Sequence, residues 1–193
     1  MKKRAILPVL AVFAAVLLTA CGVRLRSVEE LQEEAERRYG GTMVSSHSDR
    51  EEHAVVMQDA DYGFTYTIRS FKGREQIYFD ASNTVPAERT ECDYDLALMR
   101  YVDAQAAEEL DAFLEKEHAY RTPGKDFGTY TMHWYITVTD SQSKMRVAAF
   151  CNEMLNKYDP KKKLEGKGEI SISREDGSLA GYQLFHSKRQ QWY

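Results

Sequence analysis

The chain has 193 residues, of which 43% are hydrophobic and 29% charged, and its formal net charge is −4. Its 11 glycines and 4 prolines are too few for a collagen-like chain, and the hydrophobic content excludes a wholly disordered one. The mean hydropathy of −0.55 excludes a protein that crosses a membrane many times. An acidic chain is also a poor candidate for binding nucleic acid.

The N-terminus has the charge pattern of a secretory signal peptide. Three basic residues, 2–4, precede the uncharged stretch 5–20. That stretch is shorter than the ~20 apolar residues that a membrane-spanning helix needs. It ends in the order Leu18-Thr19-Ala20-Cys21, with small residues directly before the cysteine.

This four-residue sequence resembles the lipobox of bacterial lipoprotein precursors. The resemblance implies that residues 1–20 are a signal peptide, that the thiol of Cys21 is acylated, and that cleavage occurs before it. Residues 21–26 would then be the lipidated cysteine and a short tether outside the cytoplasm. Loss of the three basic residues takes the formal net charge from −4 to −7. The alternatives are an uncleaved signal anchor and a secretory signal with a chance cysteine.

Two cysteines remain after lipidation, Cys92 and Cys151. An oxidising compartment permits a disulfide between them. The favoured alternative is two unbridged thiols, because Cys151 lies on the apolar face of an expected helix and suits a small core position. The chain has no C-x-x-C motif, so a redox or zinc-ribbon site has no support.

The first expected element is a helix over 28–39. Ser27 and Glu30 have the spacing of a capping box, and Gly40 follows the last turn. Helical and alternating patterns along the rest of the chain predict two further helices and several strands. The helices are expected over 95–118 and 140–157, and the strands over 42–46, 54–58, 62–69, 76–80, 130–138, 168–174 and 178–186.

Three connections between these elements also have sequence signals. Lys72-Gly73 indicates a turn, and 81–92 is expected to be a connection without regular structure. Asp176-Gly177 between two alternating runs predicts a hairpin.

These elements predict one extracytoplasmic α+β domain over 27–193, with antiparallel sheets packed by about three helices. The order of a helix followed by an antiparallel meander is similar to cystatin-like or PepSY-like modules. The similarity concerns topology alone, and a fold does not carry a function.

Candidate contact residues are few. Lys161, Lys162 and Lys163 form a cationic cluster that would suit anionic lipid headgroups or wall polymers. The same cluster follows an expected helix C-terminus, where cations are favourable without any partner. Tyr135 and Trp192 are aromatic residues whose expected placement leaves room for a contact role.

No motif in the chain indicates catalysis, and neither a metal nor another cofactor is expected. The five histidines have no ligand spacing and are expected to be scattered at the surface or at strand edges. The sequence therefore favours a membrane-anchored, non-catalytic binding module, with membrane lipid as one partner and a protein or cell-envelope component as another. The alternative is a small cell-envelope enzyme whose site assembles only in three dimensions.

Overall fold

The computed structural model describes residues 22–76, 84–122, 132–140, 142–188 and 190–193. These residues form an α+β fold with two mostly antiparallel sheets, which confirms the predicted fold class. The chain divides into two compact units. The first contains the described residues up to Asp61 together with Thr67–Cys92, and the second contains Tyr62–Tyr66 together with Asp93–Tyr193. The expectation of one domain over 27–193 does not distinguish these units.

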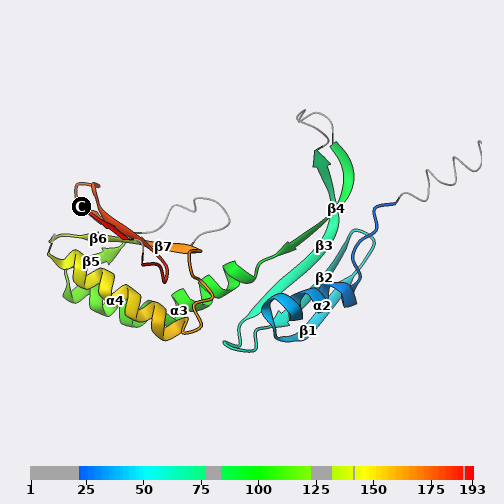
Figure 1. Ribbon diagram of the computed structural model, residues 1–193, viewed down its shortest axis with the longest axis horizontal. Helices are drawn as coiled ribbons and strands as arrows, with labels where there is room; N and C mark the ends of the chain where they lie inside the picture. The colour runs from blue at the N-terminus through cyan, green and yellow to red at the C-terminus, as the bar shows by residue number, and fades with distance from the viewer. Residues whose placement is uncertain (1–21, 77–83, 123–131, 141, 189) are drawn as a thin grey trace, which may run out of the picture. The chain divides into compact units, whose positions relative to one another are not determined.

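The first unit is one helix on a four-stranded sheet of order β1-β2-β3-β4 (Figure 1). Its elements are α2 (Val28–Tyr39), β1 (Thr42–Ser48), β2 (Glu52–Gln58), β3 (Thr65–Gln76) from Thr67 onward, and β4 (Thr84–Cys92). The helix packs over β1 and β2 and buries Leu31 and Ala35 completely. Val55 on β2 and Ile68 on β3 complete this core.

Helix α2 has the predicted bounds because both of its ends are capped. The Ser27 hydroxyl accepts a hydrogen bond from the Glu30 amide at 3.2 Å, and the Glu30 carboxylate accepts one from the Ser27 amide at 2.7 Å. Gly40 ends the helix with φ +75°, a left-handed conformation that glycine adopts without steric cost.

The second unit places two helices against a five-stranded sheet of order β5-β6-β7-β8-β9. Its elements are α3 (Tyr94–Lys116), β5 (Ala119–Arg121), β6 (Met132–Val138), α4 (Ser143–Tyr158), β7 (Gly168–Arg174), β8 (Leu179–Leu184) and β9 (Gln190–Trp192). Helices α3 and α4 lie side by side, with the rings of Phe113 and Phe150 stacked at 4.0 Å. Trp134, Ile136 and Cys151 belong to the core between helices and sheet.

One pair of strands departs from the expected antiparallel pattern. Strands β6 and β7 are parallel, and α4 is the connection between them. Parallel neighbours need such a crossover. The hairpin predicted at Asp176-Gly177 is confirmed, because β7 and β8 are antiparallel and Gly177 has φ +80°.

Two predictions in the first unit are wrong. Lys72-Gly73 is not a turn, because β3 continues through it and Gly73 pairs with Ala87. A Cβ atom at Gly73 would lie 2.5 Å from Cδ of Arg89, so a larger residue here would require the Arg89 side chain to move. Residues 84–92 of the expected connection form β4.

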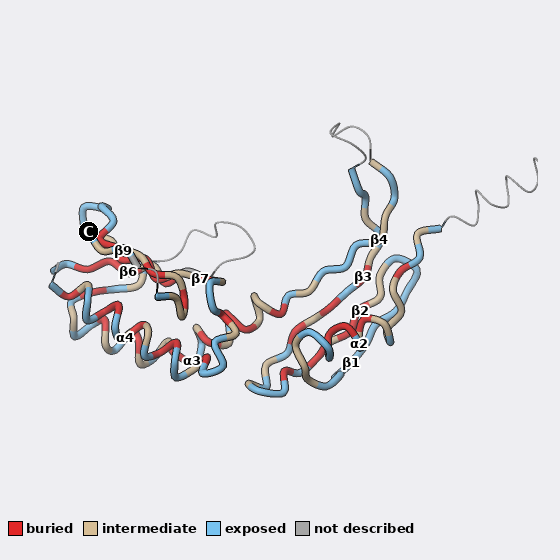
Figure 2. Tube along the Cα trace, viewed as in Figure 1, coloured by how far each residue is buried: buried red, intermediate tan, exposed pale blue. Residues whose placement is uncertain are grey.

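Other elements differ in extent. Strand β3 begins at Thr65 rather than at Tyr62, and the short strands β5 and β9 were not predicted. Of the expected strand 76–80, all but Gln76 lies outside the described residues. Buried positions alternate along the first half of β3, and β2 buries Ala54, Val55 and Met57. Strand β1 is exposed along its whole length (Figure 2).

Candidate functional site

The Lys161–Lys163 cluster lies in a tight loop that directly follows α4. The residue that shapes this loop is Asp159, the C-cap of the helix. Its carboxylate accepts hydrogen bonds from the backbone amides of Lys163 at 3.0 Å and Leu164 at 2.8 Å. Its backbone carbonyl accepts one from the amide of Lys162 at 2.9 Å. Lys162 adopts φ +56°, so the loop is held in a conformation that few non-glycine residues adopt.

Two side chains complete the surroundings of the Asp159 carboxylate. The Tyr62 hydroxyl donates to Oδ1 at 2.8 Å, and Nε2 of His186 lies 2.9 Å from Oδ2. Counting the two backbone amides, each oxygen of the carboxylate therefore has two donors. The side chains of Asp159 and His186 are 0% and 1% exposed. The expectation that the histidines are surface or edge residues is therefore wrong for His186.

The ionisation of this cluster follows from its contacts. Burial by itself raises the pKa of Asp159, but the hydrogen bonds from His186, Leu164, Tyr62 and Lys163 more than offset this and bring the pKa below its ordinary value. Burial, and then the hydrogen bond to Asp159, raise the pKa of Tyr62 to about 12. The carboxylate is therefore ionised and the phenol neutral at pH 7.

Lys163 differs from its two neighbours in the cluster. Its Nζ donates to the Tyr94 hydroxyl at 2.8 Å and lies 5.1 Å from the centre of the Tyr62 ring. The two rings belong to a group of five aromatic side chains in close contact, Tyr62, Phe64, Tyr66, Tyr94 and Tyr101. Lys163 is half-buried against this group, whereas Lys161 and Lys162 are exposed.

The other two candidate contact residues lie on different strands of the second sheet. Tyr135 is on β6 and Trp192 on β9, with β7 and β8 between them. Both are half-buried. Burial, and then the charge of Glu169, raise the pKa of Tyr135. The Trp192 ring packs on Gly181 so closely that a Cβ atom there would collide with it.

The two cysteines predicted to remain after lipidation, Cys92 and Cys151, are not bridged to each other in the structure. Cys151 is fully buried on α4, and burial raises the pKa of its thiol to about 12. Cys92 is half-buried at the end of β4, opposite Ile68. Whether an oxidising compartment bridges the two cysteines, the less favoured alternative from the sequence, is not tested by these positions.

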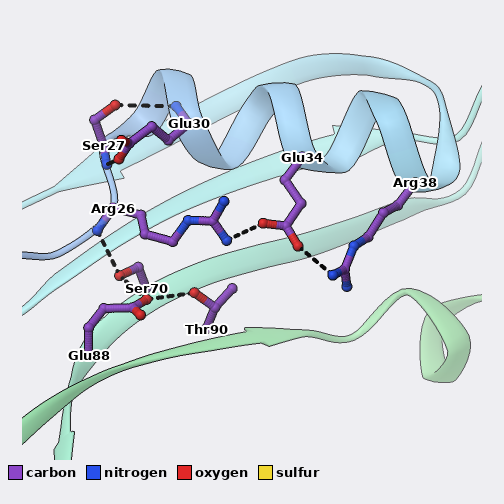
Figure 3. Close-up of polar contacts among 8 residues, drawn as sticks. All are labelled: Arg26, Ser27, Glu30, Glu34, Arg38, Ser70, Glu88 and Thr90. Carbon is purple, nitrogen blue, oxygen red and sulfur yellow. Dashed lines mark hydrogen bonds and ion pairs between the residues drawn. The ribbon is translucent and has the colours of Figure 1, made fainter.

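The segment after Cys21 is ordered by contacts with the first unit, while Cys21 itself lies outside the described residues. Leu25 is buried, and the Arg26 amide donates to the Ser70 hydroxyl at 3.0 Å (Figure 3). The Arg26 carbonyl accepts a hydrogen bond from Nδ1 of His53 at 2.7 Å.

The side chains around this segment form a connected network. The guanidinium group of Arg26 pairs with the buried carboxylate of Glu34, which also pairs with Arg38 at 3.0 Å. Ser70, itself fully buried, donates to Glu88 at 2.7 Å. The expected tether, residues 21–26, is therefore held by contacts within the first unit from Leu25 onward. Only residues 22–24 lie between Cys21 and this held part.

The structure also assembles side chains that the sequence patterns did not connect. Tyr62 and Asp159 are 97 residues apart, and neither Asp159 nor His186 belongs to a recognisable motif. The only local signal was an aspartate at the expected helix end, directly before Pro160 and the lysines.

No family model, no curated protein and no solved structure matches this chain. The likeness to cystatin-like or PepSY-like topology therefore stays an expectation. Within the described ranges, no three His, Cys, Asp or Glu side chains are grouped so that they would hold a metal ion. None of the helices in the described part of the chain is long and apolar enough to cross a membrane.

Proposed function

We propose that the chain is a lipid-anchored binding module on the outer side of a cell membrane, attached through acylated Cys21. The supporting observation is the position of the first packed residue. The lipobox-like sequence ends at Cys21, and Leu25 is already buried in the first unit. Four extended residues span at most about 14 Å, so an anchored first unit is held close to the lipid surface.

The anchor is tested by the intact mass of the membrane-extracted protein beside a Cys21→Ala variant. The expected mass is that of residues 21–193 plus acyl groups, and the variant should lack the acyl mass. A Cys92→Ala variant is the matched control and should keep it. An unmodified full-length mass, or a cleaved chain without acyl groups, would contradict the anchor.

The proposed contact site of the module is the loop that carries Lys161 and Lys162. Both side chains are exposed, and the loop beneath them is fixed by the buried carboxylate of Asp159. A fixed loop loses little conformational entropy when it binds. Two exposed lysines that are adjacent in sequence suit an anionic partner of the cell envelope, such as a polymer with phosphate groups.

This contact is tested by titrating the detergent-solubilised protein with a glycerol phosphate polymer at low salt. Replacing Lys161 and Lys162 together by alanine should weaken binding several-fold, and added salt should reduce the difference by screening. The control replaces Lys116 and Lys188, which are also exposed and change the net charge equally. Equal losses in both double variants would mean that net charge alone, and not the loop, governs the binding.

A further inference from the structure

The edge strands of the two sheets are protected to very different degrees. The ends of a sheet expose unpaired backbone groups, and proteins usually guard them with charges, proline or short strands. In the second unit, the edge strands β5 and β9 have three residues each. In the first unit, β4 carries Pro86 and three charged residues among its nine.

Strand β1 has none of these three protective features: it has no charged residue and no proline, and it is not short. Every one of its seven residues, Thr42–Ser48, is exposed. Met43 and Val44 are 43% and 58% exposed. Its single irregularity is a bulge, a shift in register against β2 between Met43 and Ser45. Ser45–Ser48 beyond the bulge pair regularly with β2.

We infer that the free edge of β1 is an interaction surface that pairs with β1 of a second copy of this chain. Antiparallel pairing of one strand with itself forms a closed two-fold dimer, and it joins two four-stranded sheets into one. The two-fold axis lies between the two copies of Ser46, in the regular part of the strand. Ser46 then lies opposite Ser46 of the second copy, and Ser45 lies opposite His47.

The charged residues that flank β1 are compatible with the pairing of β1 with itself. In the same register, Asp49 lies opposite Met43 of the second copy and Arg50 lies opposite Thr42. No charge therefore faces a like charge, which would destabilise a cross-strand pair. On β4, by contrast, self-pairing would bring the charged side chains of Glu88, Arg89 and Glu91 into the new interface.

The small size of the ladder sets the conditions under which the dimer forms. Three regularly paired residues in each copy bury much less than the roughly 1,200 Å² of stable protein complexes. Confinement of both copies to one membrane raises their effective concentration. This step rests on the proposed lipid anchor, whereas the β1 surface itself does not.

The experiment is disulfide cross-linking of a Ser46→Cys variant of the full chain in vesicles at two surface densities. A covalent dimer should form on oxidation and increase with density, because Cα atoms across an antiparallel pair lie within disulfide range. Val85→Cys, an exposed position on β4, is the matched control and should give no more than background. Circular dichroism verifies that each variant is folded.

A second pair of variants separates β1 pairing from random collision. Adding Ser48→Lys to Ser46→Cys should suppress the covalent dimer, and adding Val85→Lys should leave it unchanged. A Ser46→Cys dimer no more abundant than that of Val85→Cys, or one insensitive to Ser48→Lys, overturns the inference.

Intact mass on the same samples keeps the two proposals apart. An acylated chain without the Ser46→Cys dimer overturns the β1 pairing and leaves the anchor in place. A chain without acyl groups that still cross-links through Ser46→Cys in concentrated detergent solution overturns the anchor and supports the β1 pairing.

Discussion

Asp159 and His186 are joined by a hydrogen bond of 2.9 Å between Oδ2 and Nε2, and the two side chains are 0% and 1% exposed. The bond connects the C-cap of α4 to the turn that follows β8. His186 adopts φ +54°, a conformation that costs a non-glycine residue free energy. The contact with Asp159 holds the residue there, so the carboxylate organises both the lysine loop and this turn.

Replacement of Asp159 by asparagine should lower the free energy of unfolding of the second unit by about 3 kcal/mol. The amide group places a donor where the carboxylate had an acceptor, so at least one buried donor loses its partner. The measurement is urea unfolding followed by fluorescence of the buried Trp134. The control is Asp95→Asn, which removes a half-exposed ion pair with Lys167 and should cost less than about 1 kcal/mol. Equal effects of the two variants would contradict the structural role of Asp159.

The same carboxylate should make stability depend on acid pH. The pKa of Asp159 in the folded protein lies below its ordinary value, because the hydrogen bonds of the ionised form outweigh the effect of burial. Its contribution is therefore complete above the unfolded pKa of about 3.9, and it is lost as the pH falls through the folded value. Urea midpoints between pH 6 and pH 2.5 should fall more steeply for the natural protein than for Asp159→Asn. Parallel curves would mean that the pKa of Asp159 is the same in the folded and the unfolded protein, which would contradict this prediction.

The Cys151 thiol should be unreactive in the folded protein. It is fully buried, and burial raises its pKa to about 12, so thiolate is scarce at pH 8. After treatment with iodoacetamide under reducing conditions, mass spectrometry should find Cys151 unmodified until denaturant is added. Cys92, which is half-buried, serves as the internal comparison and should react faster. A native protein that reacts equally at both cysteines would contradict the burial of Cys151.

The predicted elements that the structure confirms are those with strong local signals. The helix 28–39 was predicted to the residue because Ser27, Glu30 and Gly40 mark both ends within one short stretch. The strand 168–174 was also predicted to the residue, since apolar and polar side chains alternate along it and Asp176-Gly177 follows. In both cases the determinants lie within a few residues of the element itself.

The failures occurred where the determinants are distant or the strand is exposed. Strand β4 was missed because its residues are mostly exposed, so no buried face imposes an alternation on the sequence. Tyr62 was assigned to a strand, but its ring and hydroxyl are held instead by Tyr101 and Asp159. No local pattern records a contact between residues 97 positions apart, and the same holds for Asp159 and His186.

Ser70 is expected to hold the segment that follows Cys21. It is fully buried, accepts a hydrogen bond from the Arg26 amide at 3.0 Å and donates one to Glu88 at 2.7 Å. Ser70→Ala removes both bonds and should cost about 1–3 kcal/mol, because the Arg26 amide loses its acceptor while Glu88 keeps only the hydrogen bond from Thr90. The variant should also loosen Leu25 and Arg26 from the sheet, because the Arg26 amide no longer has its hydrogen bond to Ser70.

The release is measured by limited trypsin digestion, with cleavage after Arg26 read by mass spectrometry. Ser70→Ala should be cleaved there faster than the natural protein. Thr90→Val is the matched control, because Thr90 donates to the same carboxylate of Glu88 at 2.6 Å but does not contact Arg26. Equal cleavage in Ser70→Ala and Thr90→Val would mean that Glu88, rather than the bond from the Arg26 amide, governs the order of this segment. Faster cleavage in Ser70→Ala alone would mean that one buried hydroxyl limits how far the first unit can move from an anchor at Cys21.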